Sequence, residues 1–398
     1  TNTTNVVIPT GVTVTVDGAA SAQSVTINGT LQGSSNTLTI SGNLTNNGTF
    51  TAGTGTVAFN ATATVGGTSN TTFNNVIISA GVNFGASKST VNGTLRINGG
   101  GFVNTNAPTY ASGSTLRYNT GGTYGRGDEW RASNPGIPHH VTLAGNTTLN
   151  YPNTDANNTI NRTLNGNLTI ETGSNLYMDF GLGISSGSIT VAGNVSLAGD
   201  LSLGDGSGGD LYVGGNWTHT TGTFAPNGRA VFFNGTGGST QTINSAETFA
   251  FLLNDKSSGG NLVLAENVTV TGTLTLTASN TATLTVNPGR RLTFASGVFN
   301  GDAVVLRSTD AGTATIGNIT GSLTGATNVT VELYIPSGRK WRSISVPLAS
   351  ATTGNNSIES VLQNNGTVTA GQGVLLWNPT GGNGFSQNTN AGAGTNIR

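Results

Sequence analysis

Three aspartates in a glycine-rich stretch are the residues of this sequence whose spacing could hold a metal ion. The segment GDLSLGDGSGGD (199–210) places Asp200, Asp205 and Asp210 at five-residue intervals. Carboxylate oxygens that meet in glycine-rich bends bind calcium in repeated β-roll turns. The full nonapeptide repeat of such turns is absent, so we favour solvated turn aspartates and keep calcium as the weaker alternative. We expect no other metal and no cofactor.

The longest non-repetitive loop, GRGDEWRASNPGIPHH (125–140), concentrates charged residues. Its Arg-Gly-Asp at 126–128 is the tripeptide of cell-adhesion ligands, but a three-residue match is weak. Local ion pairs are the simpler interpretation for its four charged residues, which are Arg126, Asp128, Glu129 and Arg131. Its two histidines, His139 and His140, would point to opposite faces of a strand, so we expect no zinc site.

Enzymatic and sugar-binding functions make different demands on this chain. Glycosidases need paired carboxylates that converge on one groove. The sixteen acidic residues are scattered, mostly singly beside glycine or asparagine. We therefore expect no enzyme and no catalytic residues. Trp130 and Trp377 could stack on a pyranose ring of a surface glycan, although burial is the alternative for each.

Composition excludes several further classes of function. Only 8% of the 398 residues are charged, and the net charge of −1 leaves no basic surface for nucleic acid. Cysteine is absent, so neither disulfides nor thiolate-bound metals hold the fold. The sequence has no apolar run of about 18 residues, so we expect no membrane insertion. The chain begins at Thr1 without a leader, so we expect an exported, extracellular form whose signal peptide has been removed.

One short phrase organises most of the chain. An apolar–Thr–apolar–x–Gly–x–apolar pattern, which predicts strand, bend and strand, recurs at VTINGTL (25–31), LTISGNL (38–44), STVNGTL (89–95), RTLNGNL (162–168), ITVAGNV (189–195), LYVGGNW (211–217) and VTVTGTL (268–274). Central glycines such as Gly166, Gly193 and Gly215 follow one another at 27 and 22 residues, which fits solenoid coils. A longer echo relates 41–62 to 214–236. The pattern predicts an all-β fold, a right-handed parallel β-helix (β-solenoid).

Threonine and asparagine fit the outer surface of such a solenoid. Like residues of successive coils stack about 4.8 Å apart, where charges of one sign would repel and threonines pack their methyl groups. Asparagines at the bends can hydrogen-bond along the stack as amide ladders. At about 22 residues per coil we expect about 15 coils.

The predicted domains are a solenoid at 1–327, with the non-repetitive loop at 119–140, and a small C-terminal β-module with a flexible tail at 328–398. Arg339, Lys340 and Arg342 mark the change in composition, and SIESVLQN (357–364) is the one helix candidate.

Two stretches resemble a known group of proteins. GGNWTHTTGTFAPNGRAVFFNGTGGSTQTI (214–243), followed by VTVTGTLTLT, is similar to repeats of large secreted surface proteins of Bacteroidota, and VELYIPSGRKWRSISVP…GQGVLLWNP resembles a module that follows such repeats. The resemblance implies export, commonly by the type IX pathway, and surface display or adhesion. It brings no catalytic residues.

The opening TNTTNVVIPTGVTVTV is strand-like from Asn5, and no lysine or arginine precedes Lys88 to discourage edge pairing. We expect this edge to pair with an identical subunit, head to tail, through Thr1, Asn2, Thr3, Thr4, Asn5, Val6, Val7 and Ile8. The sequence thus predicts a non-enzymatic extracellular structural protein, a filament subunit or an adhesin stalk. The alternative is a carbohydrate-binding adhesion module.

Overall fold

The computed structural model describes residues 4–153, 159–181, 183, 185–256, 259–277 and 282–334, with two further strands at 375–377 and 385–387. The chain forms two compact units, Thr1–Tyr334 and Ile335–Arg398. No helix occurs among the described residues, and none of them therefore forms a helix long and apolar enough to cross a membrane. The helix candidate at 357–364 lies outside the described residues.

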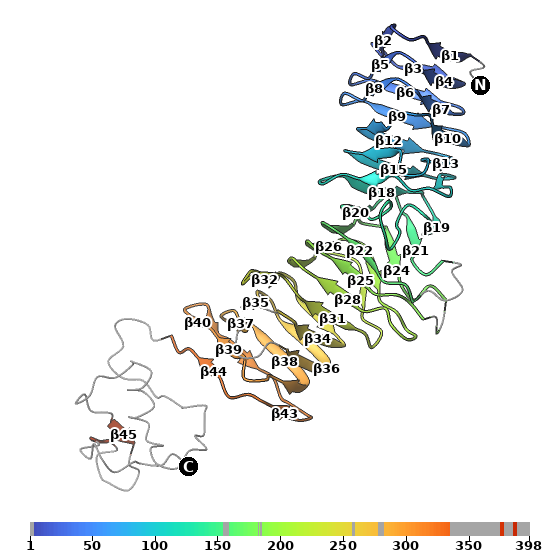
Figure 1. Cartoon of the computed structure of the whole chain (residues 1–398). Helices are drawn as coiled ribbons and strands as arrows, with labels where there is room; N and C mark the ends of the chain where they lie inside the picture. The colour runs from blue at the N-terminus through green and yellow to red at the C-terminus, as the bar shows by residue number, and fades with distance from the viewer. Residues whose placement is uncertain are drawn as a thin grey trace. The chain divides into compact units, whose positions relative to one another are not determined.

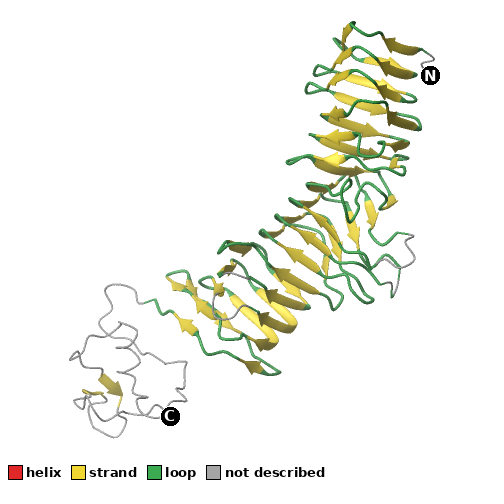
Figure 2. Cartoon of the chain, viewed as in Figure 1, coloured by secondary structure: helices red, strands yellow, loops and turns green. Residues whose placement is uncertain are grey.

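The first unit is a parallel β-solenoid, and one sheet of 15 strands runs through it (Figures 1 and 2). Its strands, in order, are β3 (Ala20–Ala22), β6 (Thr37–Ile40), β9 (Thr56–Phe59), β12 (Asn75–Ile78), β15 (Thr94–Asn98), β18 (Thr115–Asn119), β20 (His140–Leu143), β23 (Leu168–Ile170), β26 (Val195–Leu197), β29 (Trp217–His219), β32 (Thr240–Ile243), β35 (Gly260–Leu264), β37 (Ala282–Val286), β39 (Ala303–Leu306) and β44 (Val329–Val331). One strand per coil gives the 15 coils that the sequence predicts.

The other faces of the solenoid are built from shorter sheets. Near the N-terminus these are a sheet of β1 (Asn5–Ile8), β4 (Ser24–Ile27), β7 (Leu44–Asn46), β10 (Ala63–Gly66), β13 (Gly81–Asn83) and β16 (Phe102–Val103), one of β2 (Thr13–Thr15), β5 (Thr30–Gln32) and β8 (Thr49–Thr51), and one of β11 (Thr71–Phe73), β14 (Ser89–Val91) and β17 (Thr109–Tyr110). Two others follow. One comprises β19 (Thr123–Gly125), β21 (Thr148–Asn150), β24 (Asn175–Tyr177), β27 (Asp200–Ser202) and β30 (Phe224–Ala225).

The second of these has ten strands. Eight form its main path, β22 (Arg162–Leu164), β25 (Ile189–Val191), β28 (Leu211–Val213), β31 (Ala230–Phe233), β34 (Phe251–Asn254), β36 (Val268–Leu276), β38 (Arg291–Val298) and β42 (Thr315–Ile316), and two, β33 (Glu247–Phe249) and β43 (Leu323–Thr324), lie beside it. Two antiparallel pairs complete the described strands: β40 (Ser308–Thr309) with β41 (Gly312–Thr313), and β45 (Leu375–Trp377) with β46 (Phe385–Gln387) in the second unit.

Coil length varies while the inward register is kept. In the 15-stranded sheet, Ala20 pairs with Leu38 and Val141 pairs with Leu168, so successive strands of that sheet are 18 to 27 residues apart. The extra residues lie in loops, because each strand must present its apolar residues to the same narrow core. One fully buried inward column runs through eight strands, and it consists of Ile40, Phe59, Ile78, Ile97, Tyr118, Leu143, Ile170 and Leu197.

The predicted asparagine ladder is present at the corner that leads into the 15-stranded sheet. The side-chain oxygen of Asn167 accepts from the backbone N–H of Asn194 (2.9 Å), and that of Asn194 accepts from Asn216 (2.7 Å). Asn216 in turn accepts from the N–H of Thr242 (2.8 Å). Each asparagine thus satisfies a backbone amide of the next coil, at a corner for Asn194 and Asn216 and in β32 for Thr242.

Corner glycines are required where successive coils nearly touch. A Cβ on Gly193 would lie 2.3 Å from Asn167 Oδ1 and 2.8 Å from the backbone of Gly166. No side chain fits that space, which explains why glycine recurs beside the ladder asparagines.

Two details of the repeats differ from expectation. VTVTGTL (268–274) forms no bend but lies within the single strand β36, which has a register irregularity between Val270 and Thr273. The long echo joins different faces: 41–62 begins in the sheet of β7, whereas 214–236 begins in the 15-stranded sheet at β29. The same sequence pattern therefore occurs in more than one sheet of the solenoid.

The solenoid also extends past the predicted boundary at 327. β44 pairs with β39 in the long sheet, and the first compact unit reaches Tyr334.

Candidate assembly edge and loop site

Strands β1, β2 and β3 form the first coil, and each is the end strand of its sheet among the described residues (Figure 1). The exposed apolar side chains of this coil belong to its first two strands. Three of the exposed large apolar side chains lie on or between them: Val7 is 59% exposed, Val12 43% and Val14 39%. Thr4 to Ile8 of the predicted edge are thus placed on or beside β1, while Thr1, Asn2 and Thr3 lie outside the described residues.

The direction of the backbone amides shows which groups of this coil face away from the next one. In β1, the carbonyl of Ile8 accepts from Asn28 and Gly29 of the next coil. Because neighbouring residues of a strand point their amides to opposite sides, the N–H of Val7 faces the open side. On either side of β2, the carbonyl of Val12 and the N–H of Val16 form hydrogen bonds to the next coil. By the same alternation, the N–H groups of Thr13 and Thr15 face the open side.

The first coil also lacks the charges that protect sheet edges. Asp17 is the single charged residue before Lys88. Lysines and inward-pointing charges are the usual means by which edges avoid pairing with other chains. The structure therefore presents a partly apolar edge that carries one acidic residue and no lysine or arginine.

The loop at 125–140 is folded into the solenoid instead of displaying its charges. Trp130 is fully buried, its ring packs edge-on against Tyr151 with centroids 5.9 Å apart, and its Nε1–H donates to the carbonyl of Thr163 (3.1 Å). Arg126 is 3% exposed and donates to the carbonyls of Tyr151, Gly127 and Trp130. This burial removes Trp130 from the candidate glycan contacts and leaves the Arg126 side chain no access to a receptor.

Glu129 is the buried acid of this loop. Its carboxylate accepts from the N–H of Gly127 (2.7 Å) and from the hydroxyls of Tyr118 (3.0 Å) and Tyr124 (3.3 Å). Burial raises the pKa of Glu129, and the hydrogen bonds from Gly127 and Tyr118 oppose that rise. The predicted ion pairs are therefore only partly correct: Arg131 pairs with Asp128 (2.9 Å), but Glu129 is held by neutral donors in the core.

This loop fills an interruption in the sheets. Between β16 and β19, and between β17 and β22, two faces of the solenoid change from one sheet to another, while the 15-stranded sheet continues. The coil of β19 and β20 has no strand between them, and residues of the loop take that place. The buried Glu129, Arg126 and Trp130 thus serve as packing at a discontinuity of the fold.

The three aspartates of the calcium hypothesis do not converge. Asp200 accepts from the N–H of Thr223 (2.8 Å), Asp205 from Gly183 (2.8 Å) and Asp210 from Ala230 (3.0 Å). Asp200 and Asp210 thus act as the ladder asparagines do, each accepting an amide of the next coil. No group of three or more histidine, cysteine or acidic residues that could hold a metal occurs in the described part of the chain.

The two histidines lie closer together than predicted. His139 precedes β20, so the rings do not alternate across a strand, and their centroids are 4.4 Å apart. Nδ1 of His140 accepts from the N–H of Asn167 (2.9 Å), which starts the asparagine ladder. Burial and the neighbouring His139 lower the pKa of His140. His140 thus has a structural partner in Asn167, and the described residues do not add a third metal-binding side chain to the pair.

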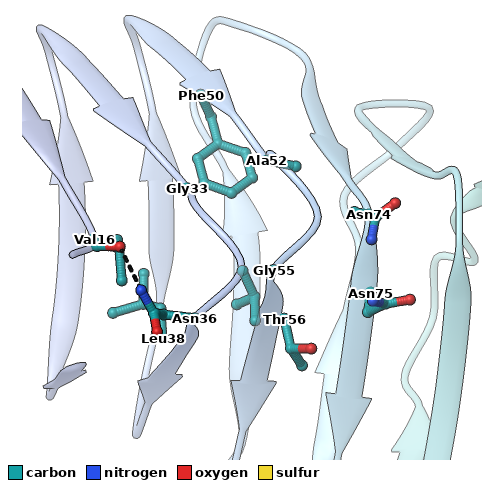
Figure 3. Close-up of a pocket in the computed structure, with 11 residues that line it drawn as sticks. Val16, Gly33, Asn36, Leu38, Phe50, Ala52, Gly55, Thr56, Asn74 and Asn75 are labelled. Atoms are coloured by element: carbon teal, nitrogen blue, oxygen red, sulfur yellow. Dashed lines mark hydrogen bonds between the residues drawn. The ribbon is translucent and has the colours of Figure 1, made fainter. Parts of the chain in front are cut away.

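Two hollows in the described part of the solenoid were considered as binding sites. One, shown in Figure 3, lies between early coils beside Phe50, Gly33 and Asn36, and its volume of about 10 Å³ holds roughly one water. The other is a surface groove of about 440 Å³ along the loop, between Thr105, Asp128 and Arg131, and none of its described lining residues is aromatic. Of the predicted glycan contacts only Trp377 remains, and its side chain lies outside the described residues.

Two buried polar clusters escaped prediction from the sequence. Lys256 is 1% exposed, and its ammonium donates to Gln241 Oε1 (2.7 Å) and to the carbonyl of Ser239 (3.1 Å). Glu247 accepts from Trp217 Nε1 (3.0 Å) and contacts His219 Nδ1 (2.8 Å). In the sequence, these two clusters are marked only by a charged or aromatic residue at a position that the strand pattern assigns to the interior or to a corner.

Comparisons of the chain with family models, with curated proteins and with solved structures found no match.

Proposed function

We propose that this protein is an extracellular structural rod, either a subunit of a surface filament or an adhesin stalk, whose copies join head to tail by pairing of strand edges. The observation that carries the proposal is the first coil, where β1 and β2 each have one edge without a neighbouring strand among the described residues, beside the exposed Val7, Val12 and Val14. Identical subunits are the partners, and the joint lies on the first coil, which begins with the predicted edge Thr1 to Ile8.

An open parallel edge exposes unpaired backbone groups to water. Outward N–H and C=O groups beside apolar side chains favour the addition of another strand. A contact between two different surfaces of identical subunits does not close on itself, so repeated addition gives a filament. Surface location and export are supported by the resemblance of the repeats to those of secreted Bacteroidota surface proteins, and the cysteine-free composition is compatible with them.

A non-enzymatic role is supported by the scatter of the acidic residues. Asp200, Asp205 and Asp210, the closest series of carboxylates in the sequence, each bind a backbone amide of a neighbouring coil. Their side chains therefore join coils to one another.

Electron microscopy of the purified chain at increasing concentration tests the proposal. We expect filaments that lengthen with concentration and repeat at no less than about 70 Å, the length of 15 coils at roughly 4.8 Å each. Isolated particles at every concentration would overturn assembly and leave the stalk as the remaining form of the rod.

A further inference from the structure

We infer that the edge which accepts the neighbouring subunit is β2, and that its occupant is a parallel strand of a second copy. This inference rests on the proposed function and narrows it to one of the strands of the first coil. It follows from three features: the end of each inward column, the corner between β1 and β2, and the sequences of the strands beneath β2.

The inward columns end differently on the two strands. On β1, the inward Ile8 is 1% exposed, so the core beneath that strand is already covered. On β2, Val14 heads the inward column that continues through the buried Leu31 to Phe50, yet Val14 is 39% exposed. An added strand on β2 would bury an inward apolar side chain, whereas on β1 it would cover the outward-facing Val7.

The corner before β2 prevents a regular coil from continuing over it. In the second and third coils this corner holds Gly29 and Gly48, whose Cβ atoms would lie 2.3 Å and 2.1 Å from carbonyl oxygens of the preceding coil. The N–H of Thr30 binds the carbonyl of Val12, and the N–H of Thr49 binds that of Gly29. Val12 therefore stands where the next coils have glycine, and its side chain occupies the place of a preceding corner.

A partner strand can thus pair with β2 but cannot turn the tight corner toward β1. The joint is a single added strand, with Val12 and Val14 beneath it and the outward N–H groups of Thr13 and Thr15 as donors. The strands of this sheet share one pattern, a central apolar residue after a threonine: TVT, TLQ and TFT. In a head-to-tail contact, a second copy presents a strand from the other end of its solenoid, where β42 (Thr315–Ile316) and β43 (Leu323–Thr324) end the ten-stranded sheet among the described residues and each carries an apolar residue next to a threonine. A strand of the same kind places its own apolar residue over Val14.

Proline substitutions on the two edges distinguish β2 from β1. Thr13→Pro removes an outward N–H from β2, and Val7→Pro removes one from β1; proline is tolerated on an edge where the N–H faces solvent. Thr13→Val and Val7→Thr are the matched controls, because both keep the N–H and a β-branched side chain. Circular dichroism and thermal melting verify that each variant folds as the wild type does.

Sedimentation of the four variants, alone and mixed with wild type, gives the result. We expect Thr13→Pro to lose assembly and, in substoichiometric amounts, to shorten wild-type filaments by ending them, while Val7→Pro and both controls assemble normally. Loss in Val7→Pro with normal assembly in Thr13→Pro would overturn the assignment to β2. Loss in both would overturn the single-strand joint, and a wild type that never assembles would instead contradict the head-to-tail assembly of the proposed function.

Discussion

Lys256 provides a test of how the solenoid core treats charge. The side chain is 1% exposed, and its ammonium is bound by neutral acceptors, Gln241 Oε1 and the carbonyl of Ser239. Burial lowers its pKa to about 8. An unfolded chain holds this proton up to about pH 10.4. Folding at neutral pH therefore includes the cost of burying an ammonium group without a carboxylate partner.

The magnitude follows from the pKa difference. A shift from about 10.4 to about 8 corresponds to roughly 3 kcal/mol in the free energy of unfolding, since each unit is about 1.4 kcal/mol. Lys256→Met removes this cost and loses the bond to Ser239, worth about 1 kcal/mol. Gln241 Oε1 keeps the N–H of Gly235 as a donor (2.8 Å). We expect the variant to be more stable by about 2 kcal/mol near pH 7.

The sign of the pH dependence sharpens the prediction. A folded-state pKa below the unfolded value means that the unfolded chain binds more protons between about pH 8 and 10.4, so wild-type stability rises with pH there. Lys256→Met lacks this rise. Buried tyrosines with raised pKa values, such as Tyr151 at about 12, destabilise both proteins equally above about pH 10. The difference between variant and wild type is therefore free of their contribution.

Guanidinium unfolding followed by tryptophan fluorescence, from about pH 7 to about pH 9.5, measures both quantities. Lys88→Met is the control, because Lys88 is only partly buried, with its ammonium on the carbonyl of Thr68. The advantage of Lys256→Met should shrink as the pH rises. A variant no more stable than wild type near pH 7, or an advantage that does not change with pH, would refute this account of Lys256.

Three further predictions concern the ladder, the loop and the aspartates. Gly193→Ala should cost more than about 3 kcal/mol in chemical unfolding, because its Cβ would meet Asn167 Oδ1 at 2.3 Å, whereas Gly18→Ala, with open space around it, should be neutral; equal costs would contradict the close stacking of corners. Glu129→Gln should remove a loss of stability that wild type shows as the pH rises above about 4.5, because a raised folded-state pKa of Glu129 favours the folded state only at pH values below that pKa; parallel pH profiles would exclude that role. Calcium should not change the melting temperature, and Asp200→Asn should stay within about 0.5 kcal/mol of wild type because an amide oxygen also accepts from Thr223; a calcium-dependent rise would restore the metal hypothesis.

The architecture was predictable because it depends on short local patterns. Alternation such as that in VTINGTL fixes which side chains point inward, and the glycine that follows marks the corner, so the coils and the asparagine ladder follow from sequence. The phrase failed at 268–274, where Gly272 lies inside a strand. A Cβ there would lie 2.7 Å from the ring of Phe251 in the neighbouring strand. This glycine accommodates a neighbouring side chain, and no local pattern distinguishes that role from a bend.

The candidate sites were less predictable because they depend on contacts distant in sequence. Glu129 looked like a surface acid in its loop, but Tyr118 and Tyr124 from neighbouring strands enclose it. Lys256 bonds to Gln241, which lies in an adjacent coil. The choice between β1 and β2 required the exposure of Val14, which no alternation pattern contains. The length and spacing of the repeats predict the coils, whereas locating a site requires knowledge of how side chains pack between coils.

Amide hydrogen exchange of the first coil at low and high protein concentration tests assembly through this edge most directly. The account predicts that the outward amides of Thr13 and Thr15 exchange rapidly in dilute protein and become strongly protected as filaments form, while amides within the long sheet stay protected throughout. Equally rapid exchange of these two amides in dilute protein and in filaments would show that the β2 edge stays open, and would contradict the account.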